Sequence, residues 1–263
     1  MPEKITGDKV LVIGWDVGGW MSGNHGFAIL EFRPGKEELI WKGWLNNRSI
    51  SEDELLELDS VLADGGLTAE TRTLKMPDLF AAYDKIVIGV DAPLGLPYDY
   101  HDFINNKNNI IMRPGREINN PLAYRRTDRL LYQKFGKKPL SATFDRLGTN
   151  YTVAAAHIRR WQQKYDFKLI PQEARDANRQ IVEVYPGILK KLKSEFSGCR
   201  RFFQMLPKRI TKGEHSYDAA LSALQGLAVL LAGSWELPEM KRPERIDEIT
   251  ATEGWIFFPA VET

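Results

Sequence analysis

The sequence is poor in cysteine, in net charge and in long apolar runs. Its single cysteine, Cys199, cannot form an internal disulfide, which favours a reducing compartment. The formal net charge of +1 argues against a general polyanion-binding surface, so contact with nucleic acid needs a local basic patch. The longest apolar stretch, residues 219–232, is broken by polar residues and is shorter than the roughly 20 residues that span a bilayer. We therefore expect a cytoplasmic protein without membrane contact.

The remaining composition is that of a globular protein. Apolar residues make up 43% of the chain and aromatic residues 11%, which is enough for a large core. The sequence has no internal repeat and no low-complexity linker. A chain of 263 residues is long for one domain but fits an α/β domain with insertions. We expect a single domain over residues 1–263, with an inserted basic helical and loop region at about 98–166.

Short β-rich runs alternate with helical patterns along the chain. Five apolar runs bounded by turn residues predict strands at residues 10–15, 27–32, 39–45, 86–90 and 181–185. Six stretches predict helices, at residues 51–62, about 77–83, 121–135, 152–165, 188–196 and 216–232. The run at 86–90 is apolar on both faces, as in a central covered strand. The pattern predicts an α/β fold in which helices cover a mixed sheet.

Three aspartates stand where α/β proteins often place their chemistry. Asp16 follows the first predicted strand, Asp91 follows the central one, and Asp218 lies in the first turn of the helix predicted at 216–232. Sites in open α/β sheets form outside the carboxyl ends of strands, so Asp16 and Asp91 converge if their strands are neighbours. Carboxylates held together raise one another's pKa unless a cation relieves the repulsion. Hard oxygen ligands suit Mg²⁺ or Mn²⁺.

Each candidate also has an ordinary structural explanation. Asp16 could end a strand before a Gly-rich turn, Asp91 could serve the turn before Pro93, and Asp218 could favour the positive end of a helix dipole. Glu183 interrupts an apolar strand, so it either faces solvent or, if the strand is covered, needs a partner such as a metal. His215 lies three residues before Asp218 and is either a proton carrier on the same side or a plain helix-start residue.

A basic segment follows the central strand. Residues 113–146 hold nine basic and three acidic residues, a local excess of +6. Arg125 and Arg129 are four residues apart and Arg126 is adjacent, so one helical face could present a cationic fork to phosphate oxygens. The alternatives are a solvated helix face, or arginines paired with Asp128 and with the core acids.

Six short motifs occur in a fixed order along the chain. They are GWDVG at 14–18, GVDAPLGLP at 89–97, YRRTDR at 124–129, EVYP at 183–186, YDAA at 217–220 and EGWI at 253–256. Together they resemble the predicted RNase H-like nuclease family known as domain of unknown function 429, over about residues 10–259. The resemblance implies a ribonuclease H-like sheet of order 3-2-1-4-5 with the first three strands antiparallel. It also implies that four acids take the metal-binding positions of nucleases and Holliday-junction resolvases of this fold: Asp16, Asp91, Glu183 and Asp218.

We therefore expect a metal-dependent nuclease that hydrolyses phosphodiester bonds in DNA or RNA. Its catalytic acids would bind Mg²⁺ or Mn²⁺, His215 would assist, and the backbone of the substrate would lie on Arg125, Arg126 and Arg129. A homodimer is a further expectation, because resolvase-like enzymes often dimerise. Two rival functions stay open at this point. One is an ATPase or phosphotransferase of the actin and sugar-kinase type, whose fold also begins with Asp-x-Gly. The other is a non-catalytic RNase H-fold module that binds nucleic acid.

Overall fold

A mixed eight-stranded sheet forms the centre of the protein. A computed structural model describes residues 9–66, 80–107, 112–145, 147–174 and 177–261. The strand order is β3-β2-β1-β4-β6-β8-β7, with β5 paired to β6 outside this path. Strand β1 is antiparallel to β2 and parallel to β4, and β2 is antiparallel to β3. The strands are β1 Val10–Asp16, β2 His25–Arg33, β3 Glu38–Arg48, β4 Lys85–Asp91, β5 Lys168–Ile170, β6 Arg179–Val184, β7 Met240–Lys241 and β8 Ile256–Pro259.

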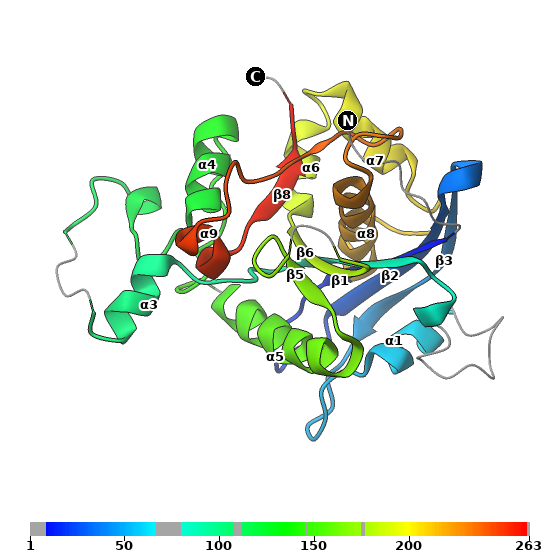
Figure 1. Ribbon diagram of the computed structural model, residues 1–263, viewed down its shortest axis with the longest axis horizontal. Coiled ribbons are helices and arrows are strands. Elements are labelled where there is room, and N and C mark those ends of the chain that lie inside the picture. The colour runs from blue at the N-terminus through cyan, green and yellow to red at the C-terminus, as the bar shows by residue number, and fades with distance from the viewer. Residues whose placement is uncertain (1–8, 67–79, 108–111, 146, 175–176, 262–263) are drawn as a thin grey trace.

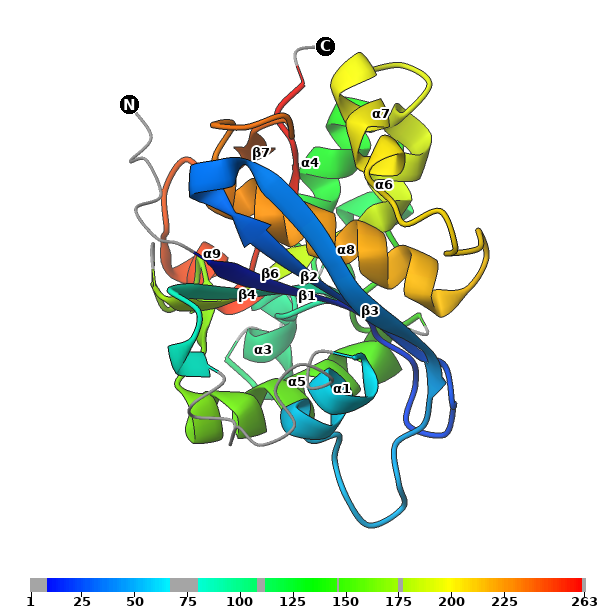
Figure 2. The same ribbon diagram turned by 90° about the vertical axis from the view of Figure 1, so that its right-hand side faces the viewer.

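Helices cover both faces of this sheet, and Figures 1 and 2 show the resulting layers. The α-helices are α1 Leu58–Asp64, α3 Tyr98–Ile104, α4 Arg126–Phe135, α5 Leu147–Tyr165, α6 Pro186–Leu192, α7 Ser197–Gln204, α8 His215–Leu231 and α9 Glu248–Glu253. Short 3-10 helices span η1 Pro34–Lys36 and η3 Glu117–Asn119. Figure 2 shows α8 on one side of the sheet and α1 with α5 on the other. No described helix is both long and apolar enough to cross a membrane.

The two faces of the sheet hold two separate apolar cores. Val10 and Val12 of β1 pack with Leu221 and the rest of α8 in one cluster. Leu11 and Ile13, which alternate with them, pack against α1 and α5 in the other cluster. Because side chains point to opposite faces at successive strand positions, this division fixes which face every residue of β1, β4 and β6 serves.

The expected mixed sheet covered by helices is confirmed. The five predicted strands correspond to β1, β2, β3, β4 and β6. The helices predicted at 121–135, 152–165 and 216–232 correspond to α4, α5 and α8, with shifted ends.

The helix predicted at 51–62 is wrong in its first half, since α1 begins only at Leu58. The Ser51 hydroxyl does accept the Glu54 N–H at 3.0 Å, as a capping residue would. However, the Leu56 N–H donates to His157 of α5, and the Leu56 carbonyl accepts from Trp161. These tertiary bonds occupy the backbone groups that a helix would use.

Candidate functional site

Helix α8 lies directly on the backbones of β1 and β4 because glycines face it. A Cβ added at Gly14 would stand 1.8 Å from the carbonyl oxygen of Ala219, and one at Gly89 would stand 2.2 Å from that of Ser222. Any larger residue would collide with helix backbone, which cannot move aside as a side chain can. The two glycines therefore bring the first turn of α8 down to the edge of the sheet.

This packing gathers Asp16, Asp91 and Asp218 on one face. Asp16 and Asp91 are register partners on parallel strands, which lie about 4.8 Å apart. Each follows its glycine by two residues, so both side chains point to the α8 face. Asp218 precedes Ser222 by one helical turn, towards the same edge of the sheet. The three aspartates predicted from their positions in the sequence are thus brought together.

Burial and mutual repulsion raise the pKa of two of these carboxyls. Burial raises the pKa of Asp16 to about 6, with Asp218 adding to the rise and the hydrogen bond from His215 opposing it. The pKa of Asp91 lies well above its ordinary value, first because of burial and then because of the charges of Asp16 and Asp218. A bound cation would lower both values by stabilising the ionised forms.

Two of the three aspartates have a basic partner. His215 Nδ1 lies 2.7 Å from Asp16 Oδ2. Lys190 Nζ lies 2.7 Å from Oδ2 of Asp218 and 2.6 Å from its Oδ1. Within the part of the chain that the structure describes, the Asp91 carboxylate has no hydrogen bond and no ion pair. Asp91 is therefore the acid most open to a ligand.

Glu183 does not join the three aspartates, contrary to the expectation for it. In β6 it is the register partner of Val90, so it points to the face opposite that of Asp91. Arg125 Nη1 and Nη2 each donate to one of its carboxylate oxygens at 2.7 Å. The Leu94 N–H donates to Oε2 as well. Glu183 is thus held by Arg125 and the Leu94 N–H, on the face of the sheet opposite the three aspartates.

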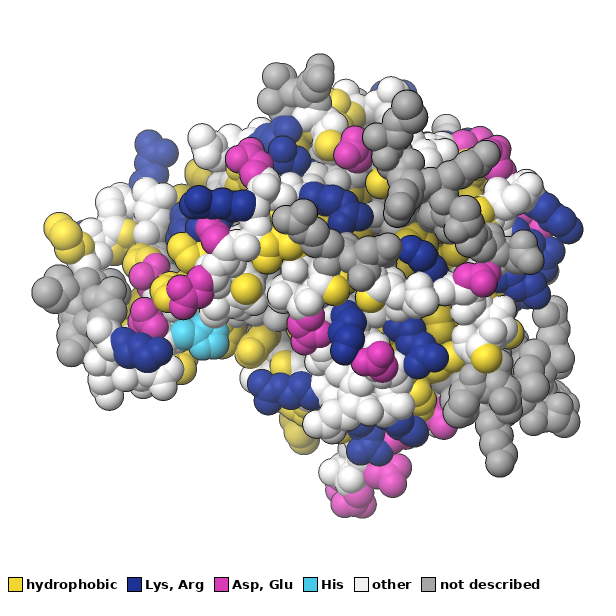
Figure 3. All heavy atoms as spheres, in the orientation of Figure 1, with side chains coloured by type: hydrophobic (Ala, Val, Ile, Leu, Met, Phe, Trp, Pro, Cys, Tyr) yellow, Lys and Arg dark blue, Asp and Glu magenta, His cyan; other side chains and the backbone are white. Residues whose placement is uncertain are grey.

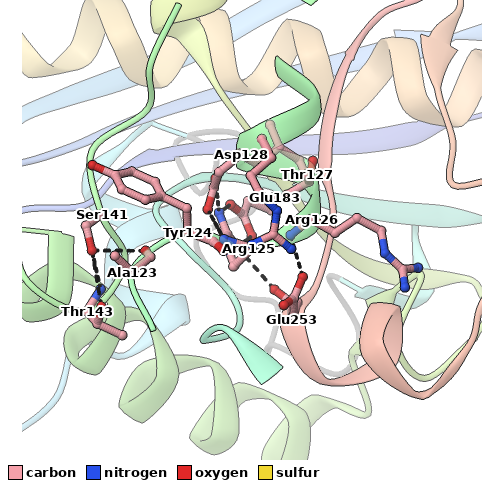
Figure 4. Close-up of polar contacts among 12 residues, drawn as sticks. Ala123, Tyr124, Arg125, Arg126, Thr127, Asp128, Ser141, Thr143, Glu183 and Glu253 are labelled. Atoms are coloured by element: carbon pink, nitrogen blue, oxygen red, sulfur yellow. Dashed lines mark hydrogen bonds and ion pairs between the residues drawn. The ribbon is translucent and has the colours of Figure 1, made fainter. Parts of the chain in front are cut away.

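Arg125 is equally committed, which corrects its assignment as a phosphate ligand. Its side chain is only 2% exposed. Two more guanidinium N–H groups donate to Asp128 and one to the Glu253 carbonyl, so all five donors are used (Figure 4). Burial alone would lower the pKa of Arg125, but Asp128 and Glu183 raise it above its ordinary value. Arg125 is thus a fixed structural cation, the alternative that the sequence left open.

The same network fixes the loop that follows Asp91. Burial raises the pKa of Glu183, and the Arg125 guanidinium and the Leu94 N–H oppose the rise. The Glu253 carboxylate accepts the Tyr98 N–H and the Arg126 N–H. The backbone between β4 and α3 is therefore tied to both β6 and α9, which holds Asp91 in place.

A cavity of about 260 Å³ opens at this edge of the sheet. Its lining includes Asp16, Asp91 and Tyr185, together with Arg125 and Glu183, which hydrogen-bond to each other. Leu140, which is 53% exposed, lies at the same cavity. The cavity gives a small polar ligand access to Asp91.

Arg126 and Arg129 line a separate groove of about 800 Å³ beside α4. Its lining has one acidic side chain, Glu244, and five basic ones: Arg126, Arg129, Lys134, Lys241 and Arg245. Figure 3 shows Lys and Arg side chains on this face of the molecule, interspersed with Asp and Glu. The Arg126 guanidinium is held by Asp247 at 2.9 Å. Arg126 and Arg129 thus share a surface from which Arg125 is absent.

Lys190 is the site residue that sequence reasoning missed. It lies in a lysine pair on a short helix, and nothing in its local pattern separates it from a solvated lysine. Only the packing of α6 against α8 brings it to Asp218. Among the described residues, no group of three or more His, Cys, Asp or Glu side chains is arranged to hold a metal ion. Lysine and histidine partners already occupy positions beside two of the three aspartates.

The fold and the site define an α/β protein with an acidic centre at the carboxyl edge of its parallel strands. The family model described as "Protein of unknown function (DUF429)" matches residues 58–189, or 132 of the 263 residues. The chain belongs to this family. No curated protein and no solved structure matches the chain significantly.

Proposed function

We propose that the protein is a divalent-metal-dependent phosphodiesterase acting on nucleic acid, built on a ribonuclease H-like sheet. The observation that carries the proposal is the gathering of Asp16, Asp91 and Asp218 on the α8 face, with the pKa of the first two raised. The strand order around β1, with β2 and β3 antiparallel and β4 parallel to it, supports the fold assignment.

The donor set fits a hard divalent cation at Asp16 and Asp91. Both are carboxylates, they are neighbours in register, and Asp91 has no partner among the described residues. A bound Mg²⁺ or Mn²⁺ would lower the pKa of water and withdraw charge from phosphate oxygens. His215 orients Asp16 through its hydrogen bond, and its side chain is 37% exposed to solvent. Glu183 stabilises the loop after Asp91 through its bonds to Arg125 and the Leu94 N–H, and it takes no direct part in the proposed reaction.

The groove beside α4 supplies the surface for the substrate backbone. Lys134 and Lys241 have no ion pair within the described residues, and both lie on its walls. Asp247 pairs with both Arg126 and Arg245, and Glu244 lies on the lining, so five cations face two acids and the groove keeps a net positive charge that attracts phosphates. Neither DNA nor RNA is favoured by this chemistry, because phosphates are common to both.

The test is cleavage of labelled oligonucleotides in the presence of Mg²⁺ or Mn²⁺. Asp91→Asn should lower the rate at least 100-fold, because it removes a carboxylate from the cation, while the melting temperature does not fall. Asp53→Asn is the matched control, since Asp53 is an exposed acid that does not line the cavity, and its rate should stay at the wild-type value. Full activity of Asp91→Asn, or cleavage that persists in chelator, would refute the proposal.

A further inference from the structure

Lys190 lies directly against Asp218, the third aspartate on the α8 face. It lies on α6, which follows β6 directly, and its ammonium contacts both oxygens of Asp218 at 2.6 and 2.7 Å. Its side chain is 39% exposed and that of Asp218 is 27% exposed. A divalent ion on Asp218 would need to displace this ammonium.

The charge of Lys190 also reaches the other two aspartates. The positive charge of Lys190 interacts with the carboxylates of Asp16 and Asp91 as well as with that of Asp218. Lysine acts here as a compact point charge on a flexible stem. One residue thus moderates the repulsion among three carboxylates.

The fourth acid offers no alternative place for a second ion. Glu183 faces the other side of the sheet, and both its oxygens accept from Arg125. The two acids that could extend the site beyond Asp16 and Asp91 are therefore each paired with a side-chain cation, Asp218 with Lys190 and Glu183 with Arg125. A two-metal centre needs further ligands on both ions, and the described residues offer only Asp218 for the second ion.

We propose that Lys190 takes the place of a second metal ion, so that the centre holds one divalent cation on Asp16 and Asp91 while the lysine neutralises Asp218. The charges of this arrangement balance: three carboxylates face one divalent ion and one ammonium. The inference rests on the proposed metal-dependent function.

The number of Mn²⁺ ions bound per chain tests this inference apart from activity. Free Mn²⁺ is measured by electron paramagnetic resonance during titration of the full-length protein. The wild type should bind one ion in the site. Lys190→Met should bind two, because Asp218 is then free, whereas Lys190→Arg should again bind one. Lys191→Met, on the same helix, is the control and should behave as the wild type. Thermal melting verifies that each variant is folded.

The outcomes separate the two proposals. Two ions bound to the wild type, or one ion bound to both the wild type and Lys190→Met, would overturn the role of Lys190 and leave metal-dependent hydrolysis standing. No ion bound at millimolar Mn²⁺ would overturn the metal-dependent function, and the role of Lys190 with it.

Discussion

At the scale of single residues, four acids of similar chemistry serve different ends because of their neighbours. Asp91 faces the cavity without a partner in the described chain, while Glu183, one strand further, is held by Arg125. The pKa of both is raised by burial, but only Glu183 has an adjacent guanidinium that keeps its negative charge compensated. The protein thus holds Glu183 in a buried network with Arg125 and Asp128, whereas the proposed function assigns Asp91 to a bound cation.

Asp16 should make the stability of the metal-free protein depend on pH. Its pKa rises from 3.8 to about 6 on folding, so the folded state binds the proton more tightly. The resulting stabilisation is complete below pH 3.8 and is lost as the pH rises through 6. Asp16→Asn removes this dependence, since asparagine does not titrate.

Relative to the wild type, Asp16→Asn should therefore gain up to about 3 kcal/mol in unfolding free energy between pH 4 and pH 7.5, at about 1.4 kcal/mol per pKa unit. Urea denaturation in chelator at the two pH values measures the difference. An unchanged difference between variant and wild type would show that Asp16 ionises normally in the folded protein.

At the scale of elements, the site depends on how closely α8 approaches the sheet. Gly14 and Gly89 allow backbone contact with the helix, and His215 and Asp218 lie in the first turn that this contact positions. The aspartates of β1 and β4 need only their strands, whereas Asp218 needs the helix at the correct height. Helix α8 also carries His215, which hydrogen-bonds to Asp16. A small change under the helix should therefore affect both stability and, through His215, ligand binding.

Gly89→Ala tests this dependence. The added Cβ would stand 2.2 Å from the Ser222 carbonyl, so α8 must shift. We expect a loss of about 1–3 kcal/mol in unfolding free energy, as in other overpacked sites, together with weaker Mn²⁺ binding. Gly35→Ala is the control, because nothing lies within 4 Å of a Cβ there. Wild-type stability of Gly89→Ala would contradict the close contact between Gly89 and the backbone of α8.

At the scale of the whole molecule, a nearly neutral chain concentrates positive charge in one groove. The net charge is +1, yet five of the basic residues line the groove beside α4. Consecutive residues connect this groove to the acidic cavity, since Trp255 lines the groove and Ile256 the cavity. A nucleic acid strand on the groove would therefore lie near the proposed metal centre.

The affinity for oligonucleotides should depend less steeply on salt concentration when basic residues of the groove are neutralised. Lys134→Gln combined with Lys241→Gln removes two phosphate contacts, which should reduce the slope of log K against log salt concentration by about 1.4, or 0.7 per contact for a single strand. Fluorescence anisotropy in chelator measures binding without cleavage. The control combines Lys208→Gln with Lys212→Gln, two exposed lysines outside the groove. Equal slopes for both double variants would remove the groove from the account.

The sequence predicted the strands and the three aspartates because these depend on local patterns. Its errors concern contacts between distant segments. In β6, Ile181 and Val182 are both buried, so alternation did not reveal which face Glu183 serves. Arg125 is buried by groups that come from positions 128, 183 and 253. The spacing of these positions along the chain does not predict that they contact one another. The single domain over residues 1–263 and the homodimer stay predictions.

The central claim is that Asp16 and Asp91 together bind a divalent ion, and anomalous diffraction from a crystal soaked in Mn²⁺ tests it most directly. The account predicts one anomalous peak in contact with a carboxylate oxygen of each residue, and none between Glu183 and Arg125. A map without a peak at Asp16 and Asp91, from a crystal soaked at millimolar Mn²⁺ near pH 7.5, would contradict it.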